Sequence, residues 1–133
     1  MRKIDKIILH CSATKEGQHF TVDDINTWHL ARGFAKIGYH YVIYLDGSVH
    51  EGRSESLIGA HCLGQNATSV GVCYIGGLDA DGKPKDTRTD VQKKALAELV
   101  EKLKSRYPEA KVYGHNEFAA KACPCFDVKR EFR

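Results

Sequence analysis

Three residues with soft, metal-binding side chains stand out in this chain: His10, His115 and Cys123. His10 ends the first apolar run, and Cys123 follows His115 by eight residues in the segment GHNEFAAKACPCFD. Two imidazoles and one thiolate can hold a catalytic zinc ion, which leaves its fourth tetrahedral position to water. Structural zinc sites usually have compact spacings such as C-x-x-C, and these residues have none. The sequence therefore predicts a metalloenzyme site assembled from both ends of the chain.

The elements expected around the two histidines support this prediction. Residues 3–10 (KIDKIILH) contain a short apolar run typical of a buried strand, and residues 111–113 form another short strand that leads into Gly114 and His115. Both histidines thus follow or end predicted strands. Ligands collect at the carboxyl ends of strands in open α/β sheets. A single strand-end histidine would be a weak signal in a chain with seven, so the conjunction with Cys123 carries the prediction.

Helices and further strands alternate along the rest of the chain. A helix begins after Thr21 and ends near Gly33, and we expect its Trp28 to pack against the sheet. A second helix begins at the capping box Thr89-Asp90-Val91-Gln92 and ends before Pro108. Further strands are predicted over residues 39–45, 48–51 and 70–75, with the turn Asp46-Gly47 joining the first two. We therefore predict a single α/β domain over residues 1–133, with a mixed sheet of about five strands flanked by helices.

Composition excludes several classes of protein. The five cysteines are odd in number and scattered, which favours reduced thiols over a secreted disulfide framework. The apolar run from Ile7 to Leu9 is far shorter than the roughly 7–15 residues of a signal peptide, so we expect a cytoplasmic protein without a membrane partner. The formal net charge is only +3, with 20 basic and 17 acidic residues interspersed. This balance predicts no nucleic-acid partner, and we expect a monomer.

Several sequence blocks, in this order, carry a resemblance to a known family. They are IILHCSAT, DINTWHLARGFAKIGYHYVI, LDGSVHEGR, GAHCLGQNATSVGVCYIGG and YGHNEFAAKACPCFD. The chain resembles zinc N-acetylmuramoyl-L-alanine amidases of the phage-lysozyme type, whose fold is shared with peptidoglycan recognition proteins. The resemblance covers nearly the whole chain.

The resemblance implies roles for six residues. It assigns the zinc ligands to His10, His115 and Cys123, whereas Cys125 falls at a position where the family varies. It also implies catalytic roles for Tyr39, in the GYH block, and Lys121, and a substrate-binding position in the cleft for His61. From the residues alone, alternatives stay open: Tyr39 is more typical of a strand aromatic in the core, Lys121 is at least as typical of a solvated loop lysine, and His61 could be a loop histidine hydrogen-bonded for structure.

The expected function is hydrolysis of the amide bond between N-acetylmuramic acid and L-alanine in peptidoglycan. We expect a phage or prophage endolysin that is made in the cytoplasm and acts on the cell wall after release. The alternatives are a cytosolic amidase that recycles soluble muropeptides and a non-catalytic peptidoglycan-binding module. Some phage amidases of this type also bind an RNA polymerase through an N-terminal extension; because nine residues precede His10, we do not expect that partner here.

Overall fold

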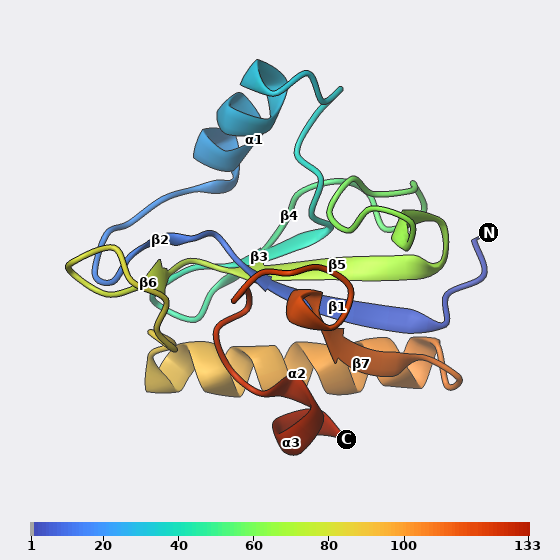
Figure 1. The fold of residues 1–133 in the computed structure, drawn as a ribbon. Helices are drawn as coiled ribbons and strands as arrows, with labels where there is room; N and C mark the ends of the chain where they lie inside the picture. The colour runs from blue at the N-terminus through green and yellow to red at the C-terminus, as the bar shows by residue number, and fades with distance from the viewer. Residues whose placement is uncertain (1) are drawn as a thin grey trace.

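A five-stranded sheet forms the centre of the computed structural model, which describes residues 2–133 (Figure 1). In spatial order the strands are β4 (Val49–Glu51), β3 (Tyr41–Ile43), β5 (Ser69–Tyr74), β1 (Lys6–Cys11) and β7 (Lys111–Gly114). The strands β3, β5, β1 and β7 are parallel, and β4 pairs antiparallel with β3. The predicted α/β fold with a mixed sheet is confirmed.

The central strand β1 separates the two sides of the sheet. Its side chains alternate between the two faces, as in any strand. Ile7, Leu9 and Cys11 belong to the larger core cluster, which also contains the buried residues of helix α2. His10 therefore points to the opposite face, away from that helix.

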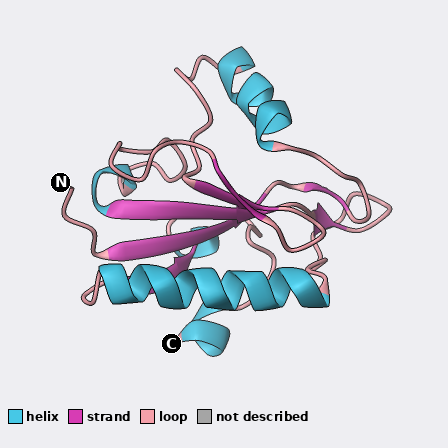
Figure 2. Ribbon diagram, turned by 180° about the vertical axis from the view of Figure 1, so that it is seen from behind, coloured by secondary structure: helices cyan, strands magenta, loops and turns pink. Residues whose placement is uncertain are grey.

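The long helix α2 (Asp90–Arg106) covers one face of the sheet (Figure 2). It begins as predicted, with a capping box in which Thr89 and Gln92 satisfy each other's backbone N–H groups. Its apolar stripe of Leu96, Leu99, Val100 and Leu103 is buried against the sheet. This packing fills the α2 face of the sheet with core side chains. A reaction site is therefore expected on the opposite face, to which His10 points.

Helix α1 (Val22–Ala31) contributes Ile25 to a second core cluster that includes Val42 of β3, but Trp28 is not part of that cluster, and the prediction for Trp28 was wrong. In Figure 1 the helix stands above the sheet, and Trp28 is 37% exposed. The segment around Ile37 and Gly38 lies between the two layers: Ile37 N–H donates to Asn26 Oδ1, and Gly38 N–H donates to His29 Nδ1. Ile25 and Ile37 are buried in the core cluster, whereas the Trp28 ring packs against Phe20.

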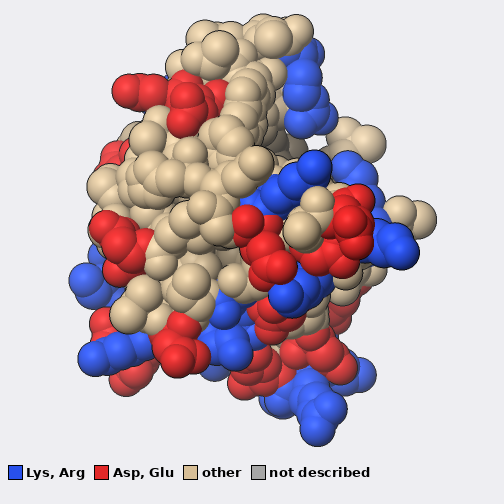
Figure 3. Space-filling view, turned by 90° about the vertical axis from the view of Figure 1, so that its left-hand side faces the viewer, with Lys and Arg blue, Asp and Glu red and all other residues tan. Residues whose placement is uncertain are grey.

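Smaller elements complete the fold. The remaining elements are a parallel pair of short strands, two 3₁₀ turns and a C-terminal helix: β2 (Thr14–Lys15), β6 (Gly77–Leu78), η1 (Asn66–Thr68), η2 (His115–Glu117) and α3 (Val128–Phe132). The β2–β6 pair was not predicted. Within residues 2–133, no helix has the length and apolarity needed to cross a membrane. Figure 3 shows acidic and basic side chains interspersed on the face it presents, without a large patch of one sign.

Candidate metal centre and cavity

Two of the predicted metal ligands come from the ends of adjacent strands. His10 is the last residue but one of β1, and His115 follows β7 directly as the first residue of η2. Leu9 and Gly114 are partners in the parallel register, so the two histidines leave the sheet side by side. Their ring centroids are 4.6 Å apart.

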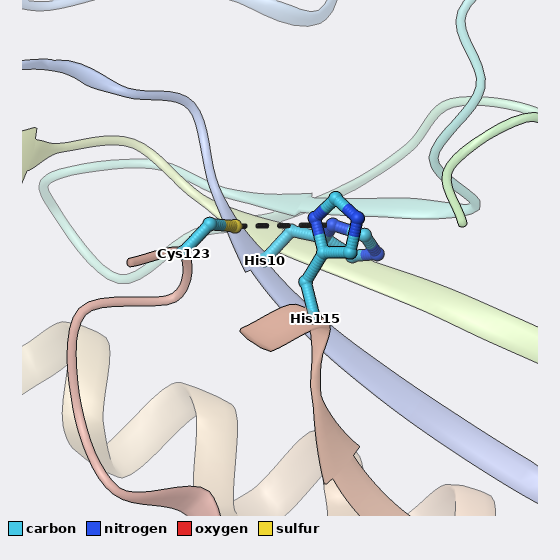
Figure 4. A group of neighbouring side chains, drawn as sticks. All are labelled: His10, His115 and Cys123. Atoms are coloured by element: carbon cyan, nitrogen blue, oxygen red, sulfur yellow. Dashed lines mark hydrogen bonds between the residues drawn. The ribbon is translucent and has the colours of Figure 1, made fainter. Parts of the chain in front are cut away.

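The third ligand, Cys123, comes from the loop after η2 (Figure 4). Cys11 N–H donates to Cys123 Sγ over 3.2 Å, and Asn116 N–H donates to the Cys123 carbonyl over 2.8 Å. The loop is also tied to the sheet by Tyr74, whose hydroxyl donates to the Pro124 carbonyl over 2.6 Å. One nitrogen of each histidine and the sulfur of Cys123 all lie within 4.8 Å of one another. We call His10, His115 and Cys123 the ligand cluster.

The ligand cluster fits a zinc ion in donor type and in spacing. His10 Nδ1 lies 3.9 Å from Cys123 Sγ, whereas tetrahedral zinc bonds of ordinary length would separate such a nitrogen and sulfur by roughly 3.5 Å. A shift of a few tenths of an ångström therefore brings them to bonding geometry.

Electrostatics keep the imidazoles neutral. Burial lowers the pKa of His10 well below its ordinary value, and the neighbouring rings of His61 and His115 lower it further. Burial also lowers the pKa of His115, with a contribution from the Lys121 ammonium. A neutral imidazole offers a lone pair to a metal, whereas an imidazolium does not.

Two carboxylates close to the ligand cluster have structural partners. Glu117 accepts a hydrogen bond from Gly114 N–H over 2.8 Å and pairs with Arg133. Asp127 is the N-cap of α3 and accepts from Arg130 N–H. Both carboxylates are therefore engaged by partners within the protein.

Cys125 has surroundings of its own, although it is only two residues from Cys123. Its thiol donates to the Gly77 carbonyl over 3.2 Å, and its sulfur lies 3.9 Å from Cys11 Sγ. Burial and the neighbouring Cys11 raise the pKa of Cys125 to about 12. It therefore contacts the β6 side of the loop rather than the ligand cluster.

A cavity of about 590 Å³ opens beside His115 on the face of the sheet opposite α2. Tyr39 and Lys121 both line it, and the Tyr39 ring lies 5.1 Å from that of His10. Burial raises the pKa of the Tyr39 phenol well above its ordinary value, which keeps its proton in place. Further lining residues that the sequence had not singled out for the site are His29, Arg32, Phe34 and Phe118. No spacing rule marks them, because the fold brings them together from α1 and two loops.

His61 lines the same cavity but is only 8% exposed. Its Nδ1 lies 2.9 Å from His10 Nε2, and its Nε2 lies 3.2 Å from Ser69 Oγ. Burial lowers the pKa of His61 to about 3. The sequence had given no sign of the contact between His61 and His10, which lie 51 positions apart.

Comparison with known proteins identifies the family. Residues 1–126 match the family described as N-acetylmuramoyl-L-alanine amidase. The endolysin of Escherichia phage T7 is 44% identical over 126 residues, which cover 95% of this chain and 83% of the phage protein.

Two solved structures have the same fold. The Ph2119 endolysin of a Thermus scotoductus bacteriophage is 29% identical, with a TM-score of 0.78 over 93% of this chain and 79% of that one. Drosophila PGRP-LB is 26% identical, with a TM-score of 0.78 over 93% and 76% of the two chains. The chain therefore belongs to the N-acetylmuramoyl-L-alanine amidase family and is an enzyme of that activity.

Proposed function

We propose that this amidase is a zinc-dependent endolysin that cleaves the bond between N-acetylmuramic acid and L-alanine in cell-wall peptidoglycan. The observation that carries the proposal is the ligand cluster at the edge of an open cavity, with Tyr39 and Lys121 in the cavity wall. The endolysin relatives support the biological setting: synthesis in the cytoplasm, then action on the wall after release.

Zinc would be held by His10, His115 and Cys123. When bound in such a site, zinc lowers the pKa of a coordinated water to about 7 and polarises a substrate carbonyl. The protein's own part is to supply two neutral nitrogen donors and one thiolate in a fixed arrangement. Cys11 N–H, which donates to the sulfur, and Asn116 N–H, which donates to the Cys123 carbonyl, hold the third ligand in place.

Lys121 would stabilise the charge that develops during amide hydrolysis. Its side chain is exposed at the cavity and lowers the pKa of both His10 and His115 by its positive charge. An ammonium near the scissile carbonyl favours the transition state, in which the oxygen becomes negative, over the neutral ground state.

Tyr39 would act as a hydrogen-bond donor to the water or to the substrate. Because burial raises its pKa, the phenol keeps its proton at neutral pH. Its ring stands beside His10 and also contacts His29, with centroids 5.1 and 5.4 Å apart, and these contacts fix the position of the ring.

The test is product analysis on purified cell-wall sacculi. The expected result is release of N-terminal alanine amines without new reducing sugar ends, lost on chelation and restored by zinc. A soluble muropeptide assayed in parallel distinguishes an endolysin from a recycling amidase, which would prefer the small substrate. Binding of sacculi without any release of amines, with zinc bound, would contradict the proposal and indicate a binding module.

A further inference from the structure

The two ring nitrogens of His10 face different neighbours. Nδ1 faces Cys123 Sγ, and Nε2 lies 2.9 Å from Nδ1 of His61. A neutral imidazole carries one proton, on one nitrogen only. For Nδ1 to offer its lone pair to a metal, the proton must be on Nε2, and His61 Nδ1 must then accept it.

This assignment determines the protonation of His61 as well. Since its Nδ1 is the acceptor, its own proton lies on Nε2, which is 3.2 Å from Ser69 Oγ. Ser69 begins β5 and is fully buried. The hydrogen bonds thus run in one direction, from His10 to His61 to Ser69, and both nitrogens of His61 are engaged with protein atoms.

The fold leaves space for the His61 ring and holds its backbone. A Cβ atom at Gly71 in β5 would lie 2.6 Å from Cγ and Cδ2 of the ring, and one at Gly59 would lie 2.8 Å from Cδ2. Only glycine at these two positions permits the ring to lie where it does. Asn66 Oδ1 accepts from both the His61 and Cys62 N–H groups over 2.9 Å. The loop therefore fixes both the position of this histidine and its orientation.

We propose that His61 is a positioning residue: its Nδ1 accepts the Nε2 proton of His10 and so turns the Nδ1 lone pair of His10 toward the metal. The substrate contact expected for His61 from the sequence stays a separate prediction. It rests on the zinc site of the proposed function but not on the substrate. Outer hydrogen-bond partners of ligand histidines fix the tautomer and the ring orientation in this way.

The test measures zinc affinity by competition with a chelator. His61→Leu removes the acceptor, and we expect zinc affinity to fall about 10–100-fold. His61→Asn places an amide oxygen near the former Nδ1, and we expect it to restore most of the affinity. His29→Leu is the matched control, because His29 is a cavity histidine of similar burial whose Nδ1 accepts from Gly38 instead of from a ligand. Its zinc affinity should equal that of the wild type.

The imidazole nitrogens can also be followed directly in the unaltered protein. In the zinc-loaded wild type, ¹⁵N NMR should show the His10 proton on Nε2, with scalar coupling across the hydrogen bond to His61 Nδ1. A His10 proton on Nδ1 would overturn the proposal even if His61→Leu failed to fold. Equal zinc affinity in wild type and His61→Leu, or equal loss in His61→Leu and His61→Asn, would overturn it as well.

Wall cleavage is measured separately on the same variants. A protein that binds zinc with this dependence on residue 61 but exposes no N-terminal alanine amines on sacculi would refute the proposed function and leave the positioning role intact. If the wild type cleaves cell walls but His61→Leu binds zinc as tightly as the wild type does, the positioning role is refuted and the proposed function stands.

Discussion

Two clusters of polar side chains lie at opposite edges of the parallel strands. At the carboxyl edge, the ligand cluster brings two imidazoles and a thiol together. At the amino edge, one carboxylate accepts hydrogen bonds from two hydroxyls and a guanidinium; this Glu55 cluster consists of Glu55, Tyr41, Tyr107 and Arg106. The Glu55 carboxylate is thus paired with three hydrogen-bond donors, whereas the ligand cluster brings three metal-binding atoms within 4.8 Å of one another.

The difference indicates what each cluster does. A partly buried acceptor surrounded by donors, such as Glu55, is satisfied by the protein and stabilises the fold. Two imidazoles and a thiol brought together are ligand types suited to a metal cation. If this distinction holds, changes in the ligand cluster should abolish metal binding and activity, and changes in the Glu55 cluster should affect stability alone.

The largest effect is expected for Cys123→Ala. Loss of a direct ligand should cost more zinc affinity than the roughly 10–100-fold typical of an outer partner, and amide cleavage should become undetectable. Elemental analysis after dialysis measures the zinc content. Full zinc occupancy in this variant would contradict the assignment of the ligand cluster.

Lys121→Ala should keep zinc but lose turnover. Removing a fixed charge beside a developing oxyanion costs on the order of a hundredfold in kcat, and kcat and kcat/KM should fall together because the interaction belongs to the transition state. Lys121→Arg is the control, since it keeps the charge on a broader head. If zinc-loaded Lys121→Ala cleaves the amide at a near-normal rate, Lys121 is a solvated loop lysine without a catalytic role.

Tyr39→Phe separates the hydroxyl from the ring. The ring contacts with His10 and His29 are retained, so the fold and zinc content should not change. Loss of a positioned proton donor should lower kcat by about a hundredfold. If steady-state kinetics on a soluble muropeptide gave an unchanged kcat, Tyr39 would be a packing aromatic.

Sequence reasoning was successful where local patterns decide structure. The capping box at Thr89, the hairpin turn at Asp46-Gly47 and the strand ends at His10 and His115 all depend on neighbouring residues. Trp28 was misplaced because α1 contributes Ile25, rather than Trp28, to the core cluster with Val42, and the apolar spacing within the helix did not distinguish these two residues.

Contacts between segments far apart in the sequence could not be predicted either. The two-residue strands β2 and β6 are too short to show alternation. The pairing of His61 with His10 depends on a loop held by Asn66 and on the space left at Gly71. Among the cysteines, residue type alone could not distinguish Cys123 from Cys125; the family resemblance did so.

Glu55→Gln tests the other side of the comparison. An amide oxygen cannot replace a carboxylate that accepts from Tyr41, Tyr107 and Arg106, so the free energy of unfolding should fall by about 1–3 kcal/mol. Zinc content and kcat should equal those of the wild type. Urea unfolding measures the first quantity, and a change in zinc content would refute the separation of the two clusters.

The same variant should change how stability depends on pH. Burial alone would raise the pKa of Glu55, but the hydrogen bonds from Arg106, Tyr107 and Tyr41 outweigh it and lower the pKa. A depressed folded-state pKa contributes stability above the unfolded value of about 4.3, and that contribution is lost as pH falls through the folded value. Glu55→Gln should therefore lose less stability on acidification than the wild type does.

The smallest effect is expected for Cys125→Ser, which completes the comparison within a single loop. A serine hydroxyl can still donate to the Gly77 carbonyl, so the free energy of unfolding should change by less than about 1 kcal/mol, and the zinc content should stay at the wild-type value. Cys123→Ser makes the same chemical change two residues earlier, and there zinc should be lost, because a serine hydroxyl is a much poorer zinc ligand than a thiolate. The two variants thus make the same substitution at two positions, so a difference in zinc content depends on position alone. Zinc loss in Cys125→Ser with retention in Cys123→Ser would transfer the ligand role to Cys125 and require the loop to rearrange around Pro124.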